Sequence, residues 1–218
     1  MKDLNLELCF RRNSVWTLLA ILTPILAGCF GATVVGVGAG ALMAADRRPS
    51  ETYVTDESIE LRTSSRIDEI FGKRAHVNVT SYNRAVLLTG EVPDAAARSQ
   101  LEKIAGGVPN VKAVSNEVQV AGVSTLGGRS NDSYITSKVK ARFLDANKFA
   151  TIHVKVVTEA GTVYLLGMVT QRESDDAVEI ARTTGGVQKV VRVFEIISEE
   201  QARQTANRPA GEAPGKKP

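Results

Sequence analysis

The chain has 218 residues and is almost balanced in charge, with 27 basic and 24 acidic side chains and a formal net charge of +3. A domain that binds nucleic acid is normally far more basic, so this balance argues against that class. The two cysteines are Cys9 and Cys29, which leaves residues 30–218 without a thiol for a disulfide bond, a metal site or a nucleophile.

The N-terminal segment has the pattern of a lipoprotein signal peptide. Three basic residues lie among the first twelve, and an apolar run follows over residues 15–22. That run is shorter than the roughly 20 apolar residues that span a bilayer. Residues 26–29 then read Leu-Ala-Gly-Cys, the lipobox pattern at which the cysteine is acylated and the chain is cut before it. We therefore predict a signal peptide over residues 1–28 and lipidation of Cys29, with an uncleaved anchor or an ordinary signal peptide as the alternatives.

The residue after the cysteine bears on the destination of a lipoprotein. An aspartate at that position is the familiar signal for retention in the inner membrane, whereas this chain has Phe30. We therefore predict a lipid anchor on the periplasmic face of the outer membrane. A stable anchor of this kind needs more than one acyl chain.

The rest of the chain contains one module twice. Residues 76–92 align with residues 153–169, and this spacing is too long for a solenoid repeat, so each copy reads as a whole domain. The predicted division is a signal peptide over 1–28, a Gly- and Ala-rich tether over 29–51, a first domain over 52–121, a linker over 122–130, a second domain over 131–199 and a disordered tail over 200–218.

Each copy predicts the element order helix, strand, strand, helix, strand. In the first copy, Ile59, Ile67 and Ile70 indicate a helix, and two segments with strand-like patterns are joined by a turn at residues 82–84. This order implies an α+β fold in which a three-stranded mixed sheet is covered on one face by two helices.

The second helix of each copy has well-marked ends. Thr170 and Glu173 have the spacing of a capping box, and the equivalent helix of the first copy begins at residues 93–94. Both helices run into a glycine pair, at residues 106–107 and 185–186, where we predict a left-handed C-terminal cap. The predicted core positions of the two helices are Ala97, Leu101, Ile104, Val178 and Ala181.

The repeat and the lipobox together make the chain resemble the dual-BON-domain lipoproteins of the outer membrane. The most specific stretches are residues 79–82, 86–90, 130–139 and 154–170. The resemblance implies two tandem BON domains, no enzymatic activity and a role in outer-membrane integrity. It also implies contact with anionic phospholipid, such as phosphatidylglycerol or cardiolipin, through the first helix of the second domain. The resemblance leaves open two further possibilities. The protein could have outer-membrane assembly machinery as a partner, and it could be enriched at the division site.

Residues 134–144 can be placed on a helix that turns roughly 100° per residue. Ile135, Val139 and Phe143 then share one narrow face, as core residues do. The opposite side is apolar or small rather than charged, and basic residues flank it, as in helices that lie at a membrane interface. The predicted phospholipid-binding residues are Tyr134, Ser137, Lys138, Lys140, Ala141, Arg142 and Leu144.

Tyrosine suits an interfacial position, because its ring is apolar and its hydroxyl group stays wet. The resemblance implies a weaker membrane contact at this position, because relatives tend to carry tryptophan where this chain has Tyr134. The alternative is that Tyr134 and Leu144 pack against the first domain.

The first domain provides an internal control for this helix. Its equivalent outer positions are Ser58, Leu61, Ser65 and Asp68, which lack an aromatic ring and include an acid. Residues 56–74 hold four basic and five acidic side chains, whereas residues 131–149 hold four basic and two acidic ones. The predicted lipid contact therefore belongs to the second domain.

An enzyme is the main rival class of function. His76 and His153 occupy equivalent positions at the predicted strand starts, where a structural role is more common than catalysis or metal binding. No motif of a hydrolase, zinc protease or phosphate-binding loop occurs. We expect no catalytic residue, no metal and no cofactor. The alternative function is a protein-interaction adaptor for envelope assembly or cell-wall machinery without direct lipid recognition.

Overall fold

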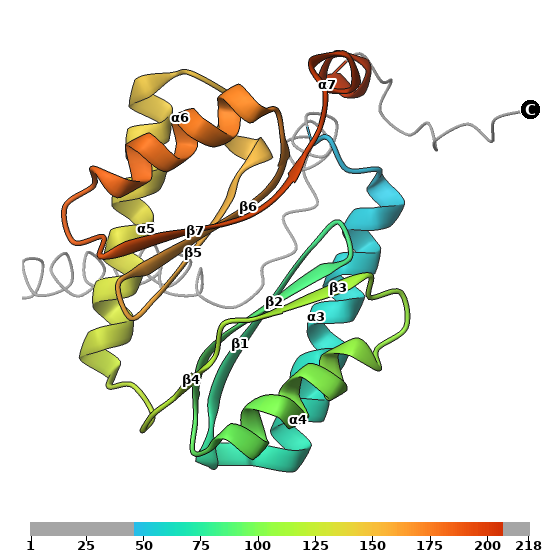
Figure 1. The fold of residues 1–218 in the computed structure, drawn as a ribbon, viewed down its shortest axis with the longest axis vertical. Helices are drawn as coiled ribbons and strands as arrows, with labels where there is room; N and C mark the ends of the chain where they lie inside the picture. Colours follow the sequence, from blue (N-terminus) through green and yellow to red (C-terminus); the bar gives the residue numbers. More distant parts are fainter. Residues whose placement is uncertain (1–45, 207–218) are drawn as a thin grey trace, which may run out of the picture. The chain divides into compact units, whose positions relative to one another are not determined.

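A computed structural model describes residues 46–206 of the chain (Figure 1). The predicted signal peptide, the lipidation site at Cys29, most of the tether and the end of the tail lie outside the described residues. Within the described range, no helix combines the length and the apolar character needed to cross a membrane.

The first domain has the predicted order of elements. Its helices α3 and α4 lie on one face of its sheet (Figure 1). The elements are α3 (Ser50–Phe71), the 3₁₀ turn η2 (Gly72–Arg74), β1 (His76–Tyr82), β2 (Ala85–Val92), α4 (Ala95–Gly106), β3 (Ala113–Asn116) and β4 (Gln119–Val120).

The second domain repeats this order and adds one helix at its end. Helices α5 and α6 cover one face of its sheet (Figure 1). The elements are α5 (Leu126–Ala146), the 3₁₀ turn η3 (Thr151–His153), β5 (Lys155–Glu159), β6 (Thr162–Val169), α6 (Gln171–Arg182), β7 (Lys189–Ile196) and α7 (Glu199–Ala206).

Both sheets are mixed, as predicted, and the second strand of each domain is the central one. β6 pairs antiparallel with β5 and parallel with β7, and β2 pairs antiparallel with β1 and parallel with both β3 and β4. The fourth strand of the first sheet reflects an interruption of one edge strand. Val118 turns into the core at that point, while the amide of Glu117 still donates to the carbonyl of Leu88 at 2.9 Å.

The buried face of α3 turns gradually around the helix axis. Ile59, Thr63, Ile67 and Phe71 are buried at steps of four residues, and each such step turns the helix by about 400°, which moves the buried stripe around the axis. By the last turn Phe71 has taken the inward position. Ile70, one of the residues whose spacing indicated this helix, is therefore 41% exposed.

A buried aspartate of the first helix holds the β-hairpin in each domain. Asn83 and Arg84 have positive φ angles of 49° and 69°, as a two-residue hairpin turn requires. Their amides donate to Asp56 at 2.8 and 2.7 Å. In the second domain, Asp132 accepts from the amides of residues 160 and 161, at 2.9 Å in each case. This pair was not predicted from the sequence, although Asp56 and Asp132 align in the repeat.

The predicted helix starts are confirmed, and α4 also ends at its predicted glycine pair, but neither helix has the predicted left-handed cap directly at its end. Thr170 and Glu173 form the capping box, and Asp94 accepts from the Ala97 amide at 2.7 Å. At the other end, Gly107 has a φ of −82°, and α6 ends before the glycine pair, at Arg182. In the first domain the left-handed residue comes later, at Asn110, and in the second domain it is Gly186, the second glycine of the predicted pair, because each domain makes one more tight turn after its helix.

Three segments predicted to be irregular contain helix. α3 begins at Ser50, inside the predicted tether, and α5 begins at Leu126, inside the predicted linker. The predicted disordered tail begins with α7, whose start is held by Ser198 and Gln201. The Ser198 hydroxyl accepts from the Gln201 amide at 3.1 Å, and the Gln201 side chain accepts from the Ser198 amide at 2.9 Å. This is a capping box with glutamine, a sequence pattern that was overlooked.

The sheet faces that the helices leave open bury a separate apolar cluster. Tyr82 and Leu87 of the first domain form this junction cluster with Tyr164 and Leu166 of the second. β2 and β6 are therefore buried on both faces, which explains their nearly continuous apolar sequences. The partly buried residues around the junction cluster are Val157, Met168, Val191 and Val193.

A buried ion pair also connects the segment before α3 to the second domain. Arg47 is 6% exposed, and its Nη1 and Nη2 donate to the Glu173 carboxylate at 2.6 and 2.9 Å. Its Nη1 also donates to the carbonyl of Met168 at 2.8 Å. The guanidinium of Arg48 lies 4.1 Å from the ring centre of Tyr82.

Candidate functional site

The inner side of α5 belongs to the core of the second domain. Ile135, Val139 and Phe143 are fully buried, which confirms the predicted inner stripe. The ring of Phe143 meets that of Phe149 edge to face, with 5.1 Å between ring centres. This packing fixes which side of the helix faces outward.

The outer side of α5 is exposed. Tyr134 is 63% exposed and Leu144 is 65% exposed, and the shorter residues Ser137 and Ala141 between them are exposed as well. Tyr134 and Leu144 keep this exposure in the presence of the first domain. The alternative that they pack against the first domain is therefore wrong.

A further apolar residue extends this side of the helix. Leu126, at the first position of α5, is 79% exposed, and it lies on the same side as Leu144, because 18 residues make five full turns of an α-helix. Leu126 was not predicted as part of this surface, because its position falls in the predicted linker. We call Leu126, Tyr134, Ser137, Ala141 and Leu144 the outer face of α5.

The basic residues around the outer face differ in what they already bind. The Lys138 ammonium donates to the Gly185 carbonyl and lies 4.5 Å from the ring centre of Tyr134, within the range of a cation–π contact. Lys140 is exposed and makes no hydrogen bond or ion pair within residues 46–206. Lys148 pairs with Asp176 at 2.6 Å.

Arg142 is directed toward the end of α6 rather than toward the outer face. Its Nη1 donates to the Ile180 carbonyl at 3.0 Å and to the hydroxyls of Thr183 and Thr184 at 3.1 and 2.9 Å. These bonds satisfy acceptors at a helix C-terminus, where a positive charge is favourable. Among the predicted phospholipid-binding residues, Arg142 therefore has a structural task within its own domain.

The acidic residues of α5 lie mostly away from the outer face. Asp132 is buried and bonded to the hairpin, so it presents no charge to solvent, whereas Asp145 is exposed beside Leu144. In the first domain the equivalent side of α3 exposes Leu61 and the acidic Asp68. The two outer helices thus differ in charge and in aromatic content, as the sequence comparison predicts.

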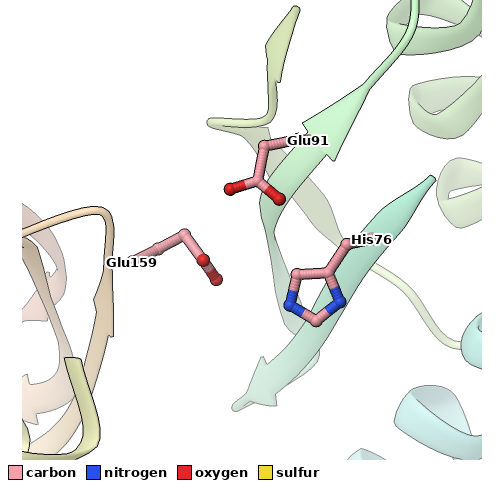
Figure 2. A group of neighbouring side chains, drawn as sticks. All are labelled: His76, Glu91 and Glu159. Carbon is pink, nitrogen blue, oxygen red and sulfur yellow. The ribbon is translucent and has the colours of Figure 1, made fainter. Parts of the chain in front are cut away.

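A second group of side chains lies where the two domains meet (Figure 2). His76 of β1 is the cross-strand partner of Glu91 on β2, and Glu159 at the end of β5 faces them from the second domain. One ligand atom from each residue lies within 4.8 Å of those from the other two. Burial raises the pKa of Glu159, an effect that the Asn78 hydrogen bond opposes and the Glu91 charge strengthens.

This group was outside the reach of the sequence analysis. His76 begins β1 as predicted, but His153 ends the 3₁₀ turn η3 instead of beginning a strand. The two histidines therefore do not have equivalent surroundings. We name His76, Glu91 and Glu159 the junction triad.

The pair of similar domains, each with two helices on one face of a mixed sheet, defines the class of protein. The family model of the BON domain matches residues 56–122 and again residues 131–198. The chain therefore belongs to the BON-domain family, with two copies of the domain in tandem.

Comparison with curated proteins gives relatives that match more than three-fifths of this chain. The chain is 35% identical to the outer membrane lipoprotein DolP of Haemophilus influenzae, over 82% of this chain and 95% of the relative. It is 34% identical to a 21 kDa hemolysin of Actinobacillus pleuropneumoniae, over 70% and 79% of the two chains. Osmotically-inducible protein Y of Escherichia coli is 32% identical over 63% and 71%. With its two BON domains, the chain is a dual-BON envelope protein of the DolP type.

Proposed function

We propose that this chain is a non-enzymatic lipoprotein of the outer membrane that binds anionic phospholipid through the outer face of α5. The observation that carries the proposal is the exposure of Tyr134 and Leu144 on a helix side bordered by Lys138 and Lys140. Apolar side chains of this size are normally turned inward on the surface helix of a domain. An interfacial helix presents them outward, between basic residues.

The contact has a simple physical basis. The Tyr134 ring and the Leu144 side chain would enter the boundary between headgroups and acyl chains, while the tyrosine hydroxyl stays hydrated. Each lysine near an anionic leaflet contributes about 1 kcal/mol. Lys138, held against the Tyr134 ring, and the unpaired Lys140 are the cations nearest to this boundary.

The predicted anchor supports the same orientation. Acyl chains on Cys29 would hold the protein on the periplasmic face of the outer membrane, and the name of the Haemophilus relative states an outer-membrane lipoprotein. Anchoring raises the local concentration of the second domain at the membrane, so a weak contact through α5 is sufficient. Support of outer-membrane integrity is the role that we propose for this arrangement.

The substitution Tyr134→Glu tests the lipid contact. It removes an interfacial aromatic ring and places a carboxylate next to an anionic surface, and we expect binding to weaken by about 2 kcal/mol, or about 30-fold. The fold should survive, because exposed substitutions change stability by no more than about 0.5 kcal/mol. The measurement is co-sedimentation of residues 30–218, which lack the acylated cysteine, with phosphatidylglycerol or cardiolipin liposomes, together with a thermal unfolding curve.

The matched control is Ser58→Glu, at the equivalent position of α3. We expect this variant to bind liposomes like the parent. Equal binding by the Tyr134→Glu variant and the parent would contradict the proposal and would favour a protein-interaction adaptor. Unfolding of the Tyr134→Glu variant would also contradict the proposal, because it would show that Tyr134 stabilises the fold of its own domain.

A further inference from the structure

The junction triad places two buried acids side by side. Glu91 and Glu159 are each 5% exposed, and neither forms an ion pair with a lysine or arginine within residues 46–206. A buried carboxylate is strongly disfavoured unless a cation or a proton compensates it. Two of them at this distance also repel each other.

The hydrogen bonds around the two acids orient them without supplying a full positive charge. Asn78 donates to Glu159 Oε2 at 2.7 Å, and the Ser124 amide donates to Glu91 Oε2 at 3.1 Å. Arg129 lines the same region, but its guanidinium donates to Ser124, through Nε at 3.2 Å and Nη2 at 3.1 Å. The side chain that can share the negative charge directly is therefore the imidazole of His76.

The surroundings also provide access from solvent. His76, Asn78 and Glu159 line an open cleft of about 410 Å³, so an ion can reach His76 and Glu159 without unfolding of the domains. The other charged groups on this cleft are Arg129 and Asp132, and Asp132 is already bonded to two backbone amides.

We propose that the junction triad binds one divalent cation of the zinc class. An imidazole nitrogen and two carboxylate oxygens are ligands that zinc takes in open sites, where water completes the coordination. Ligand atoms around such an ion lie about 3.4 Å apart, so the three groups, now within 4.8 Å of one another, need side-chain shifts of about 1 Å. The nitrogen ligand favours zinc over magnesium or calcium, which prefer oxygen alone.

The site requires both domains. His76 and Glu91 come from the first domain and Glu159 from the second, and the repeat does not duplicate the set, because Met168 occupies the position equivalent to Glu91. A bound cation would therefore join β1 and β2 to the end of β5. It would add a metal link to the apolar junction cluster.

Titration of Zn²⁺ into the full chain tests the proposal. The untagged protein is purified in detergent, stripped with EDTA and studied by calorimetry, and we expect one zinc ion per chain. Glu159→Gln and Glu91→Gln should each weaken binding by more than about 100-fold, since even the outer partners of metal ligands contribute about 10- to 100-fold. X-ray absorption spectroscopy at the zinc edge should show nitrogen and oxygen ligands and no sulfur. A spectrum without sulfur ligands excludes binding at Cys9 or Cys29.

Thermal unfolding of the parent and the variants in EDTA distinguishes a cation site from a group of side chains that only stabilises the fold. In EDTA, both glutamine variants should unfold at the same temperature as the parent or higher, because each loses one buried charge. Zn²⁺ should raise the unfolding temperature of the parent and of the surface control Glu102→Gln, and leave the two junction variants unchanged. Absence of stoichiometric binding by the parent, or equal binding by the glutamine variants, would overturn the proposal. Lower stability of the variants in EDTA would also overturn it, because it would mean that His76 and the hydrogen-bond donors compensate the two acids fully without a metal ion.

Discussion

The substitution Arg47→Ala isolates the contribution of the buried ion pair between the segment before α3 and the second domain. In the parent, Arg47 binds both oxygens of Glu173 at 2.6 and 2.9 Å, and both side chains are less than one-tenth exposed. Without the guanidinium, the carboxylate stays in a site that burial makes unfavourable. Removal of one partner from a buried pair costs about 3 to 5 kcal/mol. We expect a loss of that size in the free energy of unfolding, measured with urea.

An exposed pair in the same domain provides the comparison. Arg182 also binds both oxygens of a glutamate, Glu179, at 2.5 and 2.8 Å, but these side chains are more than half exposed. Arg182→Ala should cost less than about 1 kcal/mol. A loss below about 1 kcal/mol for Arg47→Ala as well would refute the argument from burial.

The pH dependence gives an independent check of the same pair. Burial raises the pKa of Glu173, but the Arg47 bonds and the Thr170 amide outweigh it, so the net pKa is lowered from its ordinary value of 4.5. A lowered pKa in the folded state contributes stability above the ordinary value, and this contribution is lost as the pH falls through the folded pKa. The stability difference between parent and Arg47→Ala should therefore be largest near neutral pH and shrink as the pH falls below the ordinary value of 4.5. A difference that grows on acidification would contradict the assignment.

Two further substitutions test the fold and the anchor. Gly90→Ala should destabilise the first domain by more than about 3 kcal/mol, because Gly90 has a φ of +112° and an added Cβ would lie 2.0 Å from the His76 carbonyl oxygen. The matched change Gly106→Ala, where a Cβ meets nothing within 4 Å, should leave the thermal unfolding temperature equal or higher. Cys29→Ala should yield a soluble or uncleaved precursor in membrane fractionation, and normal processing with full membrane retention would count against acylation at this residue.

The sequence predicts those features that depend on neighbouring residues in the chain. The repeat, the order of elements and the capping box of Thr170 and Glu173 follow from local periodicity and spacing, and the structure confirms them. The buried stripe that includes Val139 follows from the 3.6-residue period in the same way. The start of α5 at Leu126 was missed, because the glycines after it are typical of a linker.

Contacts between distant segments were beyond the reach of the sequence analysis. Arg142 looks like a lipid-facing cation in the helical projection, yet it reaches across to the end of α6, 38 residues away at Ile180. The junction triad requires the apposition of β1, β2 and β5, which no periodicity encodes. Local patterns thus define each domain, whereas the surface that one domain presents to the other depends on tertiary packing.

The apolar junction cluster has a consequence for the dissection of this protein. Residues 121–125 alone separate β4 from α5, and a short connection of this kind keeps two partners at an effective concentration on the order of millimolar. A small contact can then persist that two free domains would lose by dilution. In a severed second domain, Tyr164 and Leu166 would become an apolar patch that attracts other copies and lipid alike. Liposome binding by the isolated half would therefore combine the outer face of α5 with a surface that the intact chain keeps covered.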